Sequence, residues 1–305
     1  MGNVFYFQWE IALTKWMQYN ANDLTILISK FFSVLGSEIV LTAIIMVVYL
    51  GIDKNLGRKI MINTTIALNF GCALKSVIRR LRPYFVTDEV KCLVPVDNSA
   101  DMYDISAQGY SFPSLHSLNA ICVTGSLYKF TKKNILLIFA IVFSMGIGLT
   151  RIVTANHFPT DVLTGWIIGI IALELIPILE KKLGKRKFYF AFMIIFLCCF
   201  IYCRAKDLYL SYGIMSGFFF SDLFEEKYVN FKETHNPIRI AVRLSFGVII
   251  FLVLIEVFKL IIPSSIVSGS IVSYLFESLR YGLGVFATFG LYPLLFEKNI
   301  LKFKD

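Results

Sequence analysis

The sequence has few charged residues. Asp, Glu, Lys and Arg fill only 17% of the 305 positions, whereas 57% of the positions are apolar. An ordinary soluble domain has about 25% charged and 45–50% apolar residues. These charged residues are too few to cover the water-exposed surface of a soluble protein. The composition therefore excludes a soluble enzyme or a nucleic-acid binder. The mean hydropathy of +0.69 indicates an integral membrane protein instead.

Metal-binding and secretion signals are also missing. The six cysteines include no CxxC pair with metal-ligand spacing, and we interpret them as free thiols. Residues 1–23 lack the continuous apolar core and the small-residue cleavage site of a signal peptide. We therefore expect an N-terminal segment followed by a first span that acts as an uncleaved anchor.

Long apolar runs dominate the rest of the chain. A membrane-spanning helix needs about 20 predominantly apolar residues. The candidate runs are 24–50, 60–78, 113–128, 135–150, 160–179, 188–203, 207–220, 240–262 and 271–296. They predict an all-α fold, a polytopic membrane helix bundle of about nine transmembrane helices. The seventh run is short, and its Gly213 and Gly217 predict close helix contact, with a re-entrant segment as the alternative.

The sequence shows no internal repeat or low-complexity linker. We therefore predict one transmembrane domain over residues 24–296, between the N-terminal segment 1–23 and a tail at 297–305. Seventeen Lys and Arg residues lie in one set of alternate loops and nine in the other. Positive loops stay in the cytoplasm, so this bias predicts an outside N-terminus and a cytoplasmic C-terminus. It also explains the formal net charge of +9 without a nucleic-acid partner.

Some basic residues violate this rule. Arg79, Arg80, Arg82 and Arg151 fall on the outer side, together with two of the three histidines. A site that needs cations and imidazoles explains this gathering better than topology does.

The first of three candidate segments ends the second predicted span. Lys75 and Arg82 are seven residues apart, so on one helix they share a face. Pro83 follows and is expected to end that helix. Two cations on one face at the membrane boundary suit a phosphate, and anchoring to lipid headgroups by snorkelling is the alternative.

The second segment, Pro113-Ser114-Leu115-His116, opens the third span. Proline at the first helical position is preorganised for a helix start. The free N–H groups of that helix end would then face an anion, and Ser114 would add a hydroxyl donor. A histidine placed at the headgroup level is the alternative for His116.

The third segment lies between the fourth and fifth spans, and its helix again starts at a proline, Pro159. Asp161 follows His157 by four residues, close enough for a carboxylate to orient an imidazole. Arg151 precedes both on the same side. A structural hydrogen bond between Asp161 and His157 is the alternative to a prepared nucleophile.

Together these segments fit the needs of phosphoryl transfer. The reaction requires donors around three phosphate oxygens, an in-line nucleophile and a proton for the leaving oxygen. No acidic cluster suited to Mg²⁺ accompanies the segments, so lysine and arginine would take the place of a metal.

The three segments resemble the tripartite signature of the type 2 phosphatidic acid phosphatase superfamily. The spacing agrees from Lys75 to Arg82-Pro83, within Pro113 to His116, and from Arg151 through His157 to Asp161. The resemblance covers about residues 60–180, the expected catalytic core. The nine-span layout is similar to the glucose-6-phosphatase and sphingosine-phosphate phosphatase arrangement. Leu115 and Thr150 stand where the family usually has glycine and serine.

The resemblance implies a mechanism without metal or cofactor. His157 would attack phosphorus to form a phosphohistidine, Asp161 would orient it, and His116 would protonate the leaving oxygen and then activate water. The equatorial oxygens would be held by Lys75, Arg82, Ser114, the amide of Leu115, and Arg151. The side chain of Leu115 would either narrow the pocket or point away from it.

The expected function is hydrolysis of lipid phosphate monoesters or diphosphates on the non-cytoplasmic side of the membrane. The alternatives are a sugar-phosphate phosphatase of the glucose-6-phosphate type and a phosphate-lipid binding or transport protein without catalysis. The acidic loop 84–112 would repel a soluble anion and so favours a lipid. The expected partners are a phosphorylated lipid and the bilayer, and no pattern indicates an oligomeric state. The lack of a C-terminal retrieval signal favours a bacterial inner membrane over the endoplasmic reticulum.

Overall fold

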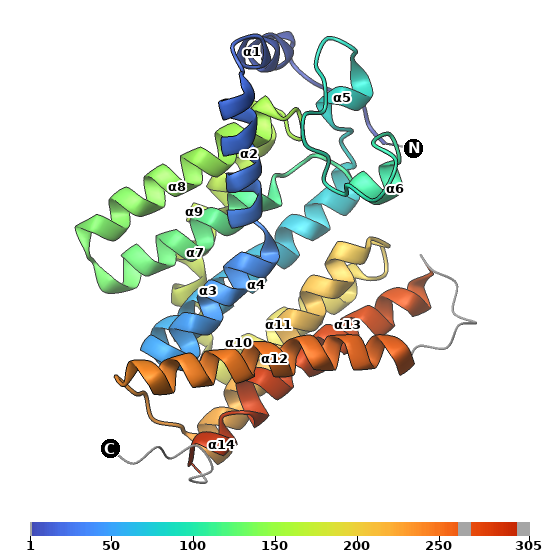
Figure 1. Ribbon diagram of the computed structural model, residues 1–305. Coiled ribbons are helices and arrows are strands. Elements are labelled where there is room, and N and C mark those ends of the chain that lie inside the picture. Colours follow the sequence, from blue (N-terminus) through green and yellow to red (C-terminus); the bar gives the residue numbers. More distant parts are fainter. Residues whose placement is uncertain (1, 262–269, 298–305) are drawn as a thin grey trace. The chain divides into compact units, whose positions relative to one another are not determined.

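The computed structural model describes residues 2–261 and 270–297 of the chain (Figure 1). Within these residues every regular element is a helix, apart from one isolated bridge between Asn3 and Arg80. The all-α prediction is therefore confirmed. The chain divides into two compact units, one of Met1–Leu41 with Phe70–Glu174 and one of Thr42–Asn69 with Leu175–Asp305. The predicted extent of a single domain stays a prediction, and each unit is described by itself.

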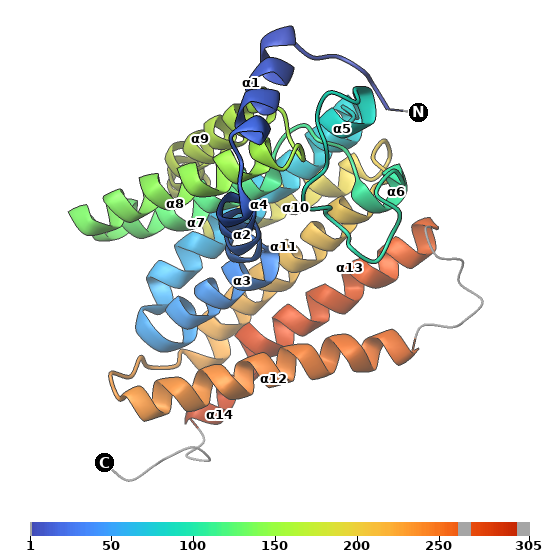
Figure 2. The ribbon, with the colours of Figure 1, turned by 45° about the horizontal axis from the view of Figure 1, so that its top comes forward.

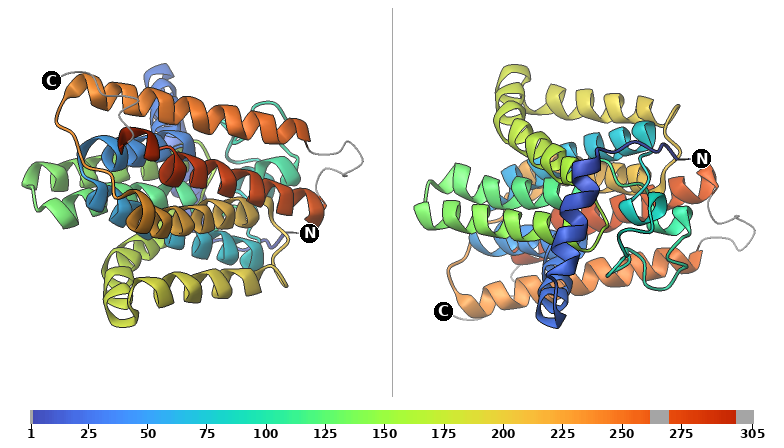
Figure 3. Two further views of the ribbon diagram at one scale, coloured as in Figure 1. Left: turned by 90° about the horizontal axis from the view of Figure 1, so that it is seen from below. Right: turned by 90° about the horizontal axis from the view of Figure 1, so that it is seen from above.

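The first unit contains a helical hairpin. Its complete helices are α1 (Gln8–Tyr19), α2 (Asp23–Leu35), α5 (Pro83–Val86), α6 (Ile105–Gln108), α7 (Leu115–Thr131) and α8 (Asn134–Val153). The end of α4 (Lys54–Ile78) and most of α9 (Pro159–Leu183) also belong to it. Helices α7 and α8 lie side by side in both views of Figure 3, and α1 and α2 pack on α8.

The second unit is built around a close helix crossing. It contains α10 (Lys185–Cys199), α11 (Lys206–Phe224), α12 (Pro237–Ile261), α13 (Ile271–Phe286), α14 (Leu294–Glu297) and the π-helical turns η1 (Val48–Ile52), η2 (Glu225–Val229) and η3 (Ala287–Leu291). A Cβ on Gly213 would lie 2.1 Å from the carbonyl oxygen of Ser278, and one on Gly217 would lie 2.3 Å from that of Gly282. This approach of α11 to α13 confirms the predicted close contact in the seventh run.

Each of the nine apolar runs falls on a helix or a broken helix. By length and composition, five helices in the described part of the chain can cross a membrane: α4, α8, α9, α12, and α13 continued through α14. A sixth span results if α2 is taken together with the helix formed by α3 (Glu38–Val47) and η1, which is bent from α2 by 51°. The nine-span count is not confirmed, because α7 with 17 residues and α10 with 15 are short for a span.

Candidate active site

All eight predicted site residues lie in the first unit. They come from the end of α4 and the turn after it, the start of α7, the end of α8 and the start of α9. Seven of them are buried, namely Lys75, Arg82, Ser114, Leu115, Arg151, His157 and Asp161. His116 is partly exposed, and it lies within range of charge interactions with His157 and with three cations: Lys75, Arg82 and Arg151. The structure therefore brings the three predicted segments together.

The first segment is not one continuous helix. Helix α4 ends at Ile78, and Arg79 then has a left-handed backbone with φ +52°. The prediction that Lys75 and Arg82 share a helical face is wrong, because residues 79–81 leave the helix and bond to the backbone of Asn3. Pro83 also does not end a helix. It begins the short α5, where its fixed φ suits the first helical position.

Arg82 fixes the backbone around the site. Its Nη1 donates to the carbonyl of Asn156 at 2.7 Å, and its Nη2 donates to the carbonyl of Gln108 at 2.7 Å. Its Nε lies 3.0 Å from the same Gln108 oxygen and 3.1 Å from that of Gly109. Lys75 donates to the carbonyl of Tyr110 at 2.9 Å. The two cations of the first segment thus hold the loop before α7, and Arg82 also holds the loop before α9.

The helix of the second segment begins two residues later than predicted. Helix α7 starts at Leu115 and Ser114 is its N-cap, accepting from the N–H of Ser117, so the placement of Pro113 at the first helical position is wrong. Serine is a favoured N-cap because its hydroxyl satisfies an otherwise unpaired N–H of the first turn. The N–H groups of Leu115 and His116 have no acceptor among the described residues. These two amides remain available to an anion, as predicted for a helix start.

The side chain of Leu115 packs on α4. Its Cδ2 would lie 2.7 Å from a Cβ built on Gly71, so the leucine occupies space that only a glycine leaves open. The change from the family's usual glycine is therefore accommodated by a glycine on the neighbouring helix.

The third segment places its histidine beside a carboxylate. Helix α9 starts at Pro159, as predicted. The backbone carbonyl of Arg151 accepts from the N–H of Asn156 and of His157, both at 3.1 Å, which folds the loop into a tight turn. Nδ1 of His157 lies 3.6 Å from Oδ2 of Asp161, a distance slightly too long for a hydrogen bond. Oδ2 itself accepts from the N–H of Phe158 at 2.8 Å.

The surroundings of His157 keep its ring neutral. Burial lowers the pKa of His157 well below its ordinary value of 6.5, and the three cations lower it further. A neutral imidazole has a lone pair on one nitrogen. Nδ1 faces Asp161, and the ring also interacts with the backbone of Ser111.

Sequence reasoning missed several residues that support this site. The Oδ1 of Asp161 accepts from Nη1 of Arg80 at 2.7 Å, and Nη2 of Arg80 donates to Glu10 at 2.8 Å. Ser33 of α2 bonds to the guanidinium of Arg151. Arg80 stood out only as a cation on the unexpected side, and no local pattern marks Glu10 or Ser33.

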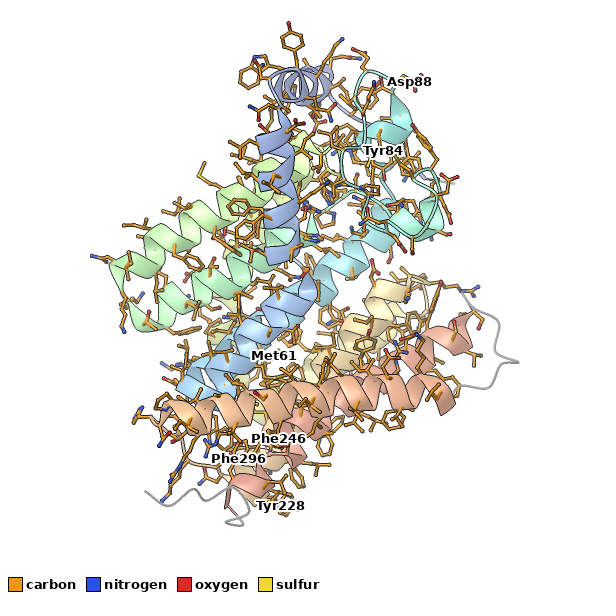
Figure 4. The ribbon with its side chains drawn as sticks, in the orientation of Figure 1. Met61, Tyr84, Asp88, Tyr228, Phe246 and Phe296 are labelled. Carbon is orange, nitrogen blue, oxygen red and sulfur yellow. The ribbon has the colours of Figure 1, made fainter. Side chains whose placement is uncertain are left out.

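A long loop that carries the short helices α5 and α6 joins α4 to α7 beside the site. One buried side chain organises it: Oε1 of Gln108 accepts from the N–H groups of Val96 and Asp97, at 2.9 and 3.1 Å. Nε2 of Gln108 donates to the carbonyls of Asp97 and Asp101, at 2.9 and 3.2 Å. The carboxylates predicted to repel soluble anions are largely exposed, as at Asp88, whereas Tyr84 is buried (Figure 4).

The fold and the site together define a class of helical membrane protein with two histidines among three cations. Residues 58–185 match the PAP2 superfamily, and residues 209–303 match the transmembrane extension of PAP2 superfamily phosphatases. The chain belongs to the PAP2 superfamily, which confirms the resemblance seen in the three motifs.

Three curated relatives are similar to parts of the chain. Phosphatidylglycerophosphatase B of Bacillus subtilis is 29% identical over 121 residues, which are 37% of this chain and 52% of that protein. Undecaprenyl-diphosphatase of Sulfolobus acidocaldarius is 27% identical over 167 residues, 52% of this chain and 72% of that protein. Lipid A 4'-phosphatase of Bacteroides thetaiotaomicron is 28% identical over 113 residues, 37% of this chain and 48% of that protein. The chain thus spans about half the length of two of these relatives, and no solved structure matches it.

Proposed function

We propose that this protein is a membrane phosphatase that hydrolyses lipid phosphate monoesters or diphosphates through a phosphohistidine, without a metal ion. One observation carries the proposal: a buried His157 with a lowered pKa lies between the carboxylate of Asp161 and three cations. A phosphate carries two negative charges that these cations neutralise, and a neutral imidazole can attack the phosphorus at neutral pH.

In the first step, Nε2 of His157 forms a bond to phosphorus while the bond from phosphorus to the bridging oxygen breaks. Burial and the nearby cations lower the pKa of His116 in the free protein, and the negative charge of the bound phosphate favours its protonated form. His116 then donates that proton to the leaving oxygen, so the lipid departs as an alcohol or, from a diphosphate, as a monophosphate. The ring of His157 gains positive charge as the new bond forms. The carboxylate of Asp161, 3.6 Å away, stabilises that charge.

In the second step, water hydrolyses the phosphohistidine. His116, now neutral, takes a proton from the water as its oxygen attacks phosphorus. The bond from phosphorus to Nε2 breaks, and inorganic phosphate leaves. Splitting one difficult displacement into two easier ones is the advantage of a covalent intermediate.

The equatorial oxygens of the phosphate are held by the ammonium of Lys75, the guanidinium groups of Arg82 and Arg151, the hydroxyl of Ser114 and the N–H of Leu115. Backbone N–H groups at the start of α7 and the positive end of that helix favour an anion there. These donors do not move during the reaction, so they stabilise the charge of the transition state at little cost.

Three findings favour a lipid substrate. The names of the three relatives all refer to lipid phosphates or diphosphates. The loop beside the site carries exposed carboxylates that repel a soluble anion. Arg151 and Asp161 lie within helices long and apolar enough to cross a membrane, close to their ends. The bias of positive loops, counted over the nine predicted spans, supports a site on the non-cytoplasmic side of the membrane and a C-terminus in the cytoplasm.

The test is phosphate release by purified protein in detergent with EDTA. Phosphatidate, phosphatidylglycerol phosphate, an isoprenyl diphosphate and glucose 6-phosphate are compared, with His157→Ala as the blank. We expect release from a lipid that is lost in the variant, and ³²P from that lipid trapped on the wild-type protein in an acid-labile form. Near-normal turnover by His157→Ala refutes the mechanism, and release from glucose 6-phosphate alone refutes the lipid substrate.

A further inference from the structure

A buried carboxylate lies just behind the site, on a helix that the three motifs do not include. Glu10 is in the first turn of α1, and its side chain is 0% exposed. Oε2 accepts from the N–H of Phe7 and from Arg80, both at 2.8 Å. Oε1 accepts from the N–H and the hydroxyl of Thr160, at 3.2 and 2.6 Å. Four donors and no solvent contact are the surroundings of an ionised carboxylate.

Arg80 joins this carboxylate to the one that faces the nucleophile. Its Nη2 binds Glu10, and its Nη1 lies 2.7 Å from both Oδ1 of Asp161 and the hydroxyl of Thr160. The side chain of Arg80 is only 2% exposed, and that of Asp161 is 0% exposed. The buried side chains of Glu10, Arg80 and Asp161 therefore form a continuous series of charged groups. Its last carboxylate, that of Asp161, lies 3.6 Å from Nδ1 of His157.

The N-terminal segment is fastened to this chain of charges. The N–H of Asn3 donates to the carbonyl of Arg79 at 2.8 Å, and the carbonyl of Phe5 accepts from Nε of Arg80 at 2.9 Å. The ring of Phe158 lies 3.9 Å from the guanidinium carbon of Arg80, and Tyr6 stacks on Phe158 with ring centres 5.8 Å apart. In Figure 2 the trace before α1 runs toward α5.

We propose that Glu10 is a positioning residue of the active site: through Arg80 it fixes the orientation and preserves the charge of Asp161 beside His157. The inference rests on the proposed function, because it assigns Glu10 to the same reaction. Helix α1 would then contribute a residue that supports the active site.

The geometry gives two physical reasons. Oδ1 of Asp161 is held by Arg80 and Oδ2 by the N–H of Phe158, so these two contacts fix the plane of the carboxylate. The charges give the second reason. Arg80 alone would cancel the negative charge of Asp161, whereas Glu10 balances Arg80 and leaves a net negative charge for the imidazolium that forms during attack.

The test is Glu10→Gln in the full-length protein. Glutamine keeps the size of the side chain and is tolerated at this position of a capping box, so α1 keeps its helix start. We expect kcat to fall by roughly ten- to a hundredfold, as for other residues that orient an active-site ligand, while KM stays within about twofold because no contact to the phosphate is lost.

The pH dependence is a readout that a merely structural role would not move. Removing a negative charge near His157 disfavours its protonated form. The acid limb of kcat/KM should therefore move to lower pH in Glu10→Gln. The other charged or titratable groups that face His157 are unchanged in this variant: Lys75, Arg82, His116, Arg151 and Asp161.

Two further variants make the result decisive. Lys15 lies on the same helix as Glu10 and forms an exposed ion pair with Glu89. Lys15→Met is therefore the control, and it should leave kcat and the pH profile unchanged. Arg80→Lys keeps the positive charge but loses the planar fork whose two nitrogens hold Glu10 and Asp161 in fixed positions, so its kcat should also fall. Wild-type kcat and pH profile in folded Glu10→Gln, even with a lower melting temperature, would show that Glu10 only anchors α1 and would overturn the inference. Turnover that survives in His157→Ala would instead overturn the proposed function, and the inference with it.

Discussion

Replacing Asp161 with asparagine removes one negative charge beside His157 and changes almost nothing in the shape of the side chain. The relevant atoms, Oδ2 and Nδ1, are 3.6 Å apart. At this distance and at an effective dielectric constant of roughly 20, an imidazolium and a carboxylate attract each other by about 4–5 kcal/mol. Each 1.4 kcal/mol or so of barrier changes a rate tenfold, so we expect kcat to fall by roughly a thousandfold.

The variant should remain folded. Arg80 loses one partner but keeps Glu10 as its counter-ion at 2.8 Å, so no buried charge is left alone. An asparagine oxygen can still accept from the N–H of Phe158, which Asp161 now holds at 2.8 Å. Its NH2 group then faces Nη1 of Arg80, and this unmatched pair of donors should cost about 1–3 kcal/mol, less than the electrostatic loss. The loss should therefore appear in catalysis more than in stability.

The assay is rapid-quench measurement of ³²P transfer to the protein, together with steady-state phosphate release. Asp88→Asn is the matched control, because it makes the same chemical change at an exposed position of the loop. A folded Asp161→Asn protein with kcat within tenfold of wild type would refute the role given to this carboxylate.

Four other predictions rest on the same region of the structure. Because the pKa of His157 is lowered and the attacking ring must be neutral, kcat/KM should hold below pH 6.5 and fall only where the ring becomes protonated; an acid limb at or above 6.5 contradicts this. The unfolded chain takes up that proton first, so stability should decrease from pH 6.5 toward the lower folded pKa, by up to about 1.4 kcal/mol per pH unit for this group, in denaturant titrations. Arg82→Lys loses the fork that binds three backbone carbonyls, and should lower stability by about 2–4 kcal/mol in thermal unfolding; an unchanged melting temperature argues against it. Gly71→Ala places a Cβ 2.7 Å from Leu115 and should cost about 1–3 kcal/mol, and the cost should shrink when Leu115→Gly is added. Strict additivity of these two substitutions would contradict the contact.

The site was predictable where its chemistry lies in short patterns. His157 and Asp161 are four residues apart around a helix start, and Pro159 begins α9 as its fixed φ requires. Lys75 and His116 were found in the same way, from residue type and spacing beside a helix end. Local spacing was sufficient for these residues because each lies at or beside the end of a helix that its own segment forms.

The rest could not be predicted, for two physical reasons. The left-handed backbone of Arg79 leaves no signature in a pattern of residues seven apart, so the helix was extended too far. Glu10 and Arg80 are 70 positions apart, and their pairing depends on how the N-terminal segment folds back. A lone acid in an apolar, aromatic stretch was the only available hint of this contact.

The loop before α7 is held at several points along its length. Arg82 binds Gln108, and Gln108 binds the backbone of residues 96, 97 and 101. Gln18, Thr154 and Asn156 bind the backbone of residues 91, 93 and 94. Residues between these ties, such as Asp88 and Ser99, are exposed and contribute little to that fastening. The exposed positions of the loop can therefore change while the hydrogen bonds that hold it beside the site stay the same. Exchanging only these positions is a way to vary the surface of the loop without loosening the residues that support the site.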